Sequence, residues 1–193
     1  MRNEFCLRIL NLGGLDYIIE ALENHINSQR IVTSSFAVLK SLAANDRVKV
    51  EMGKEDRLAL VLRAMEIHIQ NRNSCVNGFG ALSALSLRII DNSRYLVRLG
   101  LPQLLKQGLQ IHAERKHFDV LRPVCLTTRN VVARCPELKA DILEAGLEEL
   151  LNTVLKLGRE CDDEAKAALR DLGCKVELKE RWTGKMGVKV QQS

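Results

Sequence analysis

Apolar residues recur along the chain at the spacing of an amphipathic helix. Near the N-terminus they stand at positions i, i+3, i+4 and i+7, namely Leu15, Ile18, Ile19 and Leu22. At 3.6 residues per turn this spacing places them on one helix face, which a protein can bury. Similar segments follow downstream, so helices are predicted near 15–26, 57–70, 101–113 and 147–158.

A short motif opens these segments. It is Gly-Leu-Asp-Tyr-Ile-Ile at 14–19, Gly-Leu-Pro-Gln-Leu-Leu at 100–105 and Gly-Leu-Glu-Glu-Leu-Leu at 146–151. The interval from Leu15 to Leu101 is 86 residues, or two periods of 43, and the interval from Leu101 to Leu147 is 46. We therefore expect a degenerate copy near residue 57, in which the glycine and the leading leucine have both drifted.

A second motif recurs downstream of the first. Its equivalent positions lie 43, 46 and 41 residues apart and are Leu39, Leu82, Thr128 and Leu169. Long third helices are predicted near 30–44, 73–90, 117–134 and 162–173. Short first helices are predicted near 2–12, 46–52, 92–99 and 136–145. A period of roughly 40–47 residues with helical units is typical of armadillo and HEAT repeats.

The units resemble the armadillo repeat, with Gly-Leu-x-x-Leu-Leu opening the second helix and a motif similar to Ala-Leu-x-Asn-Leu-Ala in the third. The segment 170–184 also resembles one member of that family more specifically. The resemblance covers about residues 1–174. It implies an all-α, right-handed superhelical solenoid of about four three-helix repeats, at about 1–44, 45–90, 91–134 and 135–174. Residues 175–193 are expected to form a basic, partly disordered tail.

The first predicted helix has no preceding unit to cover it. Phe5, Leu7 and Ile9 would then be partly bare, whereas stacked repeats need polar capping units for solubility. We therefore interpret the chain as the C-terminal part of a longer solenoid, or as a short isoform, with further N-terminal repeats expected.

Glycine and proline positions agree with these helix boundaries. Gly100 and Gly146 stand where a left-handed turn would end a helix. Pro102 and Pro136 stand in first turns, where the missing N–H costs nothing. Pro123 falls inside a predicted third helix and should kink that helix or mark its start.

Composition and charge narrow the classes of function. Of 193 residues, 46% are hydrophobic and 27% are charged, and the formal net charge is +5. Basic and acidic residues are interspersed without a long Lys/Arg run, so nucleic acid is an unlikely partner on sequence grounds. The positive charge fits either a generally solvated surface or a groove for acidic protein segments. No apolar run approaches the ~20 residues that span a bilayer, so a membrane partner is not expected.

Six cysteines contain no Cys-x-x-Cys pair and match neither a zinc ribbon nor a small disulfide framework. We predict free thiols in a reducing compartment, cytoplasmic and possibly also nuclear. Cys125 has no base within reach, since His117 lies two helical turns away, so an inert buried thiol is preferred to a nucleophile. Cys161 and Cys174 flank the last helix and are expected to be more exposed.

Three histidines recur late in the second helices, at His25, His68 and His112. A metal site is rejected because zinc ligands lie ~2 Å from one ion, whereas equivalent helices lie ~8–10 Å apart. Inheritance within the repeat explains the recurrence, and His117 is interpreted as an isolated helix-start residue. No nucleotide-binding, hydrolase or metalloprotease motif is present, so neither a cofactor nor an enzymatic activity is predicted.

The resemblance implies that third helices line a concave groove that binds a partner without catalysis. In nuclear-import armadillo proteins, a Trp and an Asn four residues apart on this helix hold an extended basic peptide. The matching pairs here are Ala37/Ser41, Gly80/Ala84, Leu126/Asn130 and Ala167/Asp171. They contain no Trp and a single Asn, so recognition of a basic import signal by this ladder is not expected.

Four residues past the Asn position lies a row that is mostly basic, made of Asn45, Arg88, Arg134 and Lys175. An i+4 step keeps the same helix face, so these cations could line the groove and match an extended acidic ligand. Alternatively, they are solvated cations that favour the dipole at helix C-termini. The residues proposed to contact a partner are Asn77, Ala84, Arg88, Leu126, Asn130, Arg134 and Asp171.

These observations predict a protein-interaction scaffold whose groove binds a peptide or helical segment of a protein partner. The alternative is a nucleic-acid-associated helical repeat that uses the basic groove and tail.

Overall fold

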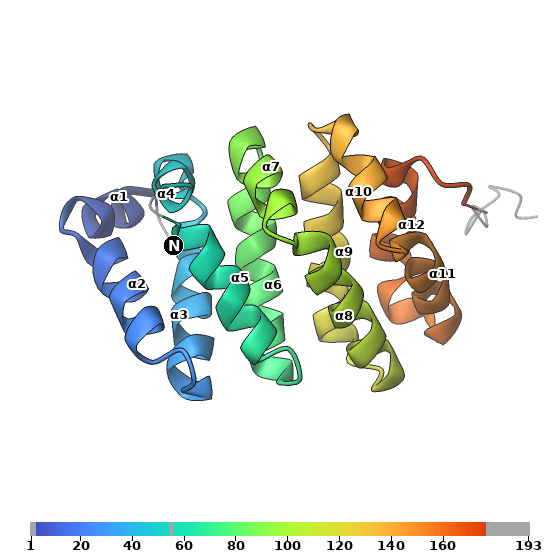
Figure 1. The fold of residues 1–193 in the computed structure, drawn as a ribbon, viewed down its shortest axis with the longest axis horizontal. Helices are drawn as coiled ribbons and strands as arrows, with labels where there is room; N and C mark the ends of the chain where they lie inside the picture. Colours follow the sequence, from blue (N-terminus) through green and yellow to red (C-terminus); the bar gives the residue numbers. More distant parts are fainter. Residues whose placement is uncertain (1–2, 55, 177–193) are drawn as a thin grey trace, which may run out of the picture.

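The computed structural model describes residues 3–54 and 56–176, and every regular element in those two ranges is helical (Figure 1). The α-helices are α1 (Asn3–Asn11), α2 (Gly14–Asn24), α3 (Gln29–Leu42), α4 (Asp46–Met52), α5 (Arg57–Ile67), α6 (Arg72–Ser86), α7 (Ile90–Arg98), α8 (Leu101–Glu114), α9 (Phe118–Val132), α10 (Lys139–Glu144), α11 (Leu147–Leu157) and α12 (Asp162–Leu172). Two 3₁₀ turns, η1 (Pro136–Leu138) and η2 (Arg159–Cys161), precede α10 and α12. Most of the predicted tail lies outside the described residues.

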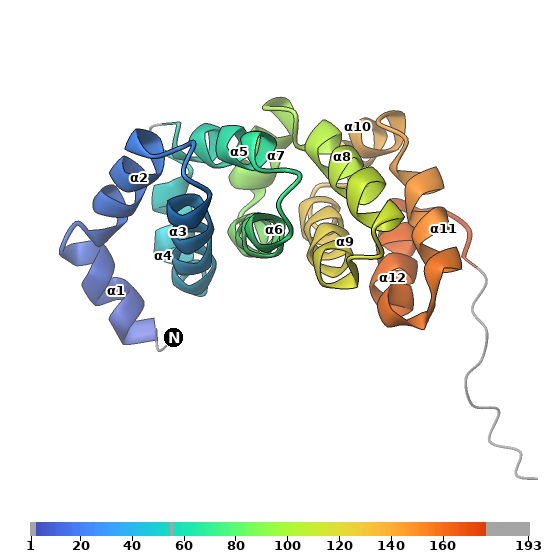
Figure 2. The ribbon, with the colours of Figure 1, turned by 90° about the horizontal axis from the view of Figure 1, so that it is seen from below.

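The longer helices form two rows. Helices α3, α6, α9 and α12 pack on one another in that order, and α2, α5, α8 and α11 do the same. Figure 2 shows the first row on the concave side of the curved molecule and the second row on the convex side. This arrangement is consistent with an armadillo-type helical repeat, and it places the predicted third helices where a groove would lie.

Three of the four predicted second helices begin after a glycine in the left-handed region. The φ values are 73° at Gly13, 100° at Gly100 and 86° at Gly146, which confirms the turn predicted at the last two. Asp56, with φ of 54°, precedes α5 in the same conformation. Asp is among the few L-residues that visit this region routinely, so it can replace glycine here.

The leading leucine has not drifted in the second unit, contrary to expectation. Leu58 lies 43 residues from both Leu15 and Leu101, and all three are buried. The positions equivalent in the third helices are buried as well, at Leu39, Leu82, Thr128 and Leu169. The hydroxyl of Thr128 donates to the carbonyl oxygen of Val124 at 3.1 Å, so a polar residue fits a core position.

Prolines stand within or at the start of helices. Pro102 lies in the first turn of α8, and Pro136 begins η1, as predicted. Pro123 lies well inside α9, five residues after its first residue, so the suggestion that it marks the helix start is wrong. Its missing N–H leaves the usual i−4 partner, the Asp119 carbonyl, without that hydrogen bond.

The recurring histidines join neighbouring units. The Nε2 atoms of His68 and His112 lie 2.7 Å from the Ile26 carbonyl oxygen and 2.9 Å from the Ile69 carbonyl oxygen. A carbonyl only accepts, so each imidazole donates across to the end of the preceding second helix. His25 occupies the equivalent position in the first unit. The recurrence therefore has a structural cause, because each period repeats the same connection.

No helix within the described ranges is long and apolar enough to cross a membrane.

Candidate functional site

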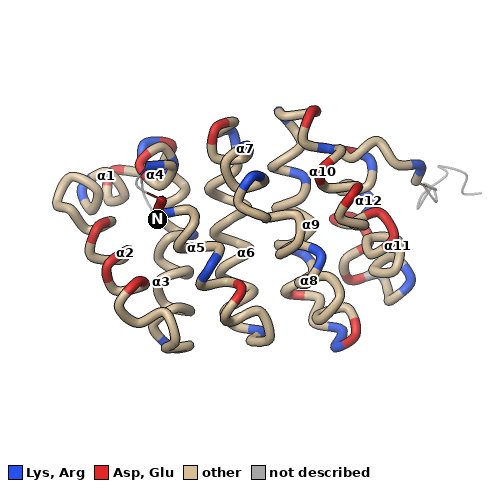
Figure 3. The backbone as a smooth tube through the Cα atoms, viewed as in Figure 1, with Lys and Arg blue, Asp and Glu red and all other residues tan. Residues whose placement is uncertain are grey.

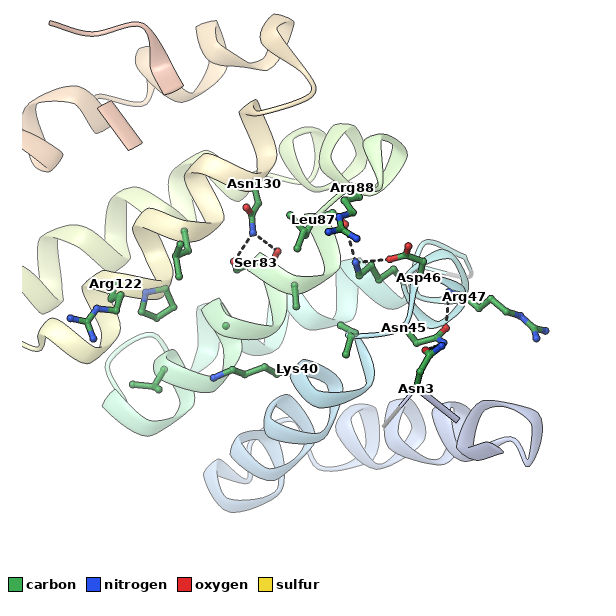
Figure 4. A pocket seen from close by; sticks show the side chains of 18 of the residues that line it. Asn3, Lys40, Asn45, Asp46, Arg47, Ser83, Leu87, Arg88, Arg122 and Asn130 are labelled. Atoms are coloured by element: carbon green, nitrogen blue, oxygen red, sulfur yellow. Dashed lines mark hydrogen bonds and ion pairs between the residues drawn. The ribbon is translucent and has the colours of Figure 1, made fainter. Parts of the chain in front are cut away.

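A cavity of about 1110 Å³ opens on the concave side between α1, α3, α4, α6 and α9. Figure 4 shows the side chains that line it. Its apolar surface includes Ala84 and Leu87 from the α6 region and Pro123 and Leu126 from α9. We call this space the concave cavity. It combines an apolar floor with polar and charged groups at its edges, as binding sites commonly do.

Four of the seven predicted contact residues line the concave cavity, namely Ala84, Arg88, Leu126 and Asn130. The other three do not. The amide of Asn77 donates to the Asn73 carbonyl oxygen at 3.1 Å, and Asp171 accepts from Arg129 Nε at 2.9 Å. Arg134 is exposed beyond the end of α9.

Asn130 connects two helices. Its Nδ2 atom lies 2.9 Å from both the carbonyl oxygen and the Oγ atom of Ser83, so α9 is tied to α6. An amide group carries two N–H hydrogens, and both have an acceptor here. The sequence motif matches Asn130 to the Asn that holds a peptide in nuclear-import armadillo proteins, but it does not reveal this internal partner.

The predicted basic row is wrong as a helix-face feature. Helix α6 ends at Ser86, and α9 and α12 also end before the cation, so a continued i+4 step does not apply to Arg88, Arg134 or Lys175. Asn45 is buried, and its Oδ1 caps α4 by accepting from the backbone N–H groups of Arg47 and Val48. Arg88 is the one cation of the row that lines the concave cavity.

A buried lysine, missed in the sequence, holds the end of α6. The Lys49 side chain is 4% exposed, and its Nζ atom contacts Asp46 Oδ1 at 2.8 Å and the Leu87 carbonyl oxygen at 3.0 Å. The hydrogen bond and charge of Lys49 lower the pKa of the Asp46 carboxyl, with a smaller effect from Arg88. Arg88, which follows Leu87, has φ of 69°, a value in a region that non-glycine residues seldom adopt.

Charged side chains around the cavity differ in whether they are paired. Arg122 Nε lies 2.9 Å from Glu164 Oε1, and Asp119 pairs with Arg72. Lys40 and Arg88 make no hydrogen bond or ion pair with their side chains among residues 3–54 and 56–176. The cavity therefore carries two cations that no described side chain pairs directly, and the charge of Arg88 is balanced in part, through space, by the Asp46 carboxylate.

The cysteines agree only partly with expectation. Cys125 is buried. A hydrogen bond with Cys161 is the largest cause that raises its pKa, and burial is the second, so the thiol stays protonated as an inert thiol would. Cys161 is fully buried, so its predicted exposure is wrong, whereas Cys174 is half-buried. His117 stands at the start of α9 as predicted but is not isolated, because its Nδ1 atom lies 3.0 Å from His112 Nδ1.

Acidic and basic residues are interspersed along the described chain, as Figure 3 shows. The two rows of helices, the histidine connections between neighbouring units and the concave cavity are those of an all-helical repeat protein consistent with the armadillo type. Over 97% of its length the chain is 34% identical to armadillo repeat-containing protein 6 of Homo sapiens and of Pongo abelii. It is 30% identical over 98% of its length to the armadillo repeat-containing protein 6 homolog of Drosophila melanogaster.

These homologues confirm the predicted resemblance to the armadillo repeat family. The chain spans 38% of the length of the human and Pongo relatives and 40% of the Drosophila relative, and the match falls on a C-terminal part. A scan against models of protein families gives no match, and neither does a search of solved structures.

Proposed function

We propose that the chain is a non-catalytic interaction scaffold that binds a peptide or helical segment of a protein partner in the concave cavity. The observation that carries this proposal is the cavity of about 1110 Å³, lined by apolar side chains and by unpaired cations. Its volume exceeds the usual range of small-molecule pockets, so it can receive several side chains. We also propose that the helices form about four repeats of a right-handed superhelix, which would extend this surface along α12.

Protein binding is supported further by the names of the relatives, because armadillo repeats are interaction scaffolds. A nucleic-acid ligand has less support. Its basis is the net charge of +5, yet acidic and basic residues are interspersed along the described chain in Figure 3, without the long basic run that phosphate contacts favour. Steep loss of oligonucleotide affinity with added salt would favour that alternative.

A paired charge reversal tests the proposed cavity. Arg88→Glu changes a cavity-lining residue, and Arg134→Glu changes an exposed arginine that also follows a third helix but lies outside the cavity. Proximity labelling in cells should recover a set of partners that Arg88→Glu loses and Arg134→Glu retains. Identical partner sets for the wild type and both variants would contradict binding in the concave cavity.

A further inference from the structure

We propose that the concave cavity recognises its protein partner through two carboxylates, which Lys40 and Arg88 bind on either side of a short apolar stretch. This inference rests on the proposed function and specifies the chemistry of the ligand. It also assigns recognition to side-chain charges instead of to an asparagine that holds the ligand backbone.

The first argument is the distribution of charge. Lys49 and Asp46 neutralise each other at 2.8 Å, and Arg122 is paired with Glu164. Arg47 points away from the cavity in Figure 4. Lys40 and Arg88 are left as cations that face the cavity without a partner among the described residues. An occupant with carboxylates would supply that partner, and complementary charge at an interface increases both specificity and association rate.

Lys40 occupies a position that the repeat motif leaves open. Gly80 of α6 stands where import-type armadillo proteins have a Trp, and a Cβ added there would lie 3.0 Å from Lys40 Cδ and Cε and 3.2 Å from Nζ. The lysine stem thus extends from α3 across the α6 backbone, and its ammonium group reaches the cavity. Long basic side chains commonly bury their methylene stem and keep the charge in water. Gly80 therefore makes room for the Lys40 ammonium group where import-type armadillo proteins have an aromatic ring.

Arg88 is held by its backbone. A left-handed φ is unfavourable for a residue with a side chain, and such conformations cluster at functional sites. Here φ is 69°, and the preceding carbonyl, that of Leu87, accepts from the buried Lys49 at 3.0 Å. The buried lysine fixes the chain just after α6, which positions the Arg88 side chain at the edge of the cavity.

The space between the two cations is apolar and offers few donors. Ala84, Leu87 and Leu126 line it, and both N–H hydrogens of Asn130 already have acceptors on Ser83. Asn130 therefore cannot donate to a ligand carbonyl without breaking the connection between α9 and α6. Apolar ligand side chains fit this part, and the carboxylates flank them.

The helix sets the spacing. Gly80 and the end of α6 at Ser86 are separated by about 9 Å at 1.5 Å per residue, and Arg88 follows two residues later. An extended ligand rises about 3.3 Å per residue and points alternate side chains to opposite faces, so two carboxylates that both face the cavity should be about four residues apart. Such a segment has an acid at each end and an apolar residue midway, and the two residues in between face away from the cavity.

Three labelled peptides test the inference on the full chain. The first is Gly-Ser-Glu-Ser-Leu-Ser-Glu-Ser-Gly, the second replaces both Glu with Gln, and the third replaces both with Lys. Fluorescence anisotropy should show saturable binding of the Glu peptide with Kd below about 1 mM. The Gln peptide should bind roughly five- to thirty-fold more weakly, since two ion pairs are lost, and the Lys peptide more weakly still.

Two variants locate the effect. Lys40→Gln/Arg88→Gln should remove the preference for Glu over Gln, whereas Arg134→Gln, a matched change outside the cavity, should keep it. Circular dichroism and thermal unfolding check that each variant is folded. The Lys40 and Arg88 side chains are both exposed.

The outcomes separate the inference from the proposed function. Equal affinity of the Glu and Gln peptides, with amide hydrogen exchange protected on α6 and α9, overturns charge recognition but leaves the cavity as a binding site. Failure of all three peptides to bind overturns both. Tighter binding of oligouridine RNA than of the Glu peptide, lost in the double variant, assigns the cations to phosphates and overturns the inference.

Discussion

The imidazole of His112 lies 2.9 Å, measured from Nε2, from the carbonyl oxygen of Ile69, which stands 43 residues earlier in the chain. This interval is one period of the repeat, and His68 makes the same contact with Ile26 one period before. In neutral His112, donation by Nε2 leaves Nδ1 as an acceptor, so Nδ1 accepts the hydrogen bond that His117 Nδ1 donates at 3.0 Å. A single proton thus occupies the space between the two rings.

This relationship predicts a loss of stability in acid. Burial lowers the pKa of His112, with smaller effects from His117 and Arg115 in the same direction, opposed by the Ile69 hydrogen bond and Asp119. The unfolded chain, with an ordinary His pKa of about 6.5, then binds more protons than the folded one as the pH falls. The contribution of His112 is complete above about pH 6.5 and declines below it. Urea unfolding at about pH 7.5 and 5.5 measures this decline.

Substitution separates His112 from other acid effects. His112→Gln should lower the free energy of unfolding at neutral pH and reduce its dependence on pH. His25→Gln, at the exposed equivalent position, should change neither. Equal pH dependence in the wild type and His112→Gln would show that another group is responsible.

Thiol accessibility gives a second prediction. Cys174 is half-buried, whereas Cys6, Cys75, Cys125, Cys135 and Cys161 are buried. Burial raises the pKa of Cys75 to about 12, so its thiolate is scarce at any pH that keeps the protein folded. Alkylation with iodoacetamide near pH 8, followed by peptide mass spectrometry, should modify Cys174 first. The other five should react only after denaturant is added, and early labelling of Cys75 would contradict the packing described.

Close packing of α8 against α6 predicts an effect at Gly108. A Cβ at this position would lie 2.6 Å from Cζ of Phe79, whose ring is fully buried and cannot easily move. Alanine is a better helix former than glycine by up to about 1 kcal/mol, but overpacking a core commonly costs about 1–3 kcal/mol. Gly108→Ala should therefore lower the free energy of unfolding. The exposed neighbour Gln107 supplies the control, since Gln107→Ala should change it by less than about 0.5 kcal/mol.

The sequence predicted helix order and position well because the apolar period is strong. The helix ends were less predictable. The third helix of the second unit was predicted to run to about residue 90, but α6 ends at Ser86. Arg88 was selected by extending a helix that stops at Ser86, and it lines the cavity because the chain turns there. Asn130 was selected by its place in the motif, but its partner Ser83 depends on how α6 and α9 pack. The bond from Lys49 to the Leu87 carbonyl joins two units and leaves no local pattern, so this role of Lys49 had no signal in the sequence.

Lys49 supplies the last prediction, by comparison with Lys54. Both lysines form i, i+3 ion pairs at 2.8 Å, with Asp46 and Glu51, but their side chains are 4% and 55% exposed. Lys49→Met removes the partner of the Leu87 carbonyl as well as that of Asp46, and a hydrogen bond made by a charged group contributes about 1.5–3 kcal/mol. Lys54→Met breaks a surface pair that contributes about 0–1 kcal/mol. Chemical denaturation of both variants measures the difference.

Hydrogen exchange distinguishes a general loss of stability from a local one. Because Lys49 holds the chain at the end of α6, Lys49→Met should speed amide exchange around Leu87 and Arg88 more than in α11 and α12. The same variant should weaken binding of the Glu peptide with Lys40 and Arg88 both still present, since Arg88 would no longer be held in its left-handed conformation. Unchanged peptide affinity in a folded Lys49→Met protein would mean that the arginine reaches its ligand without this support.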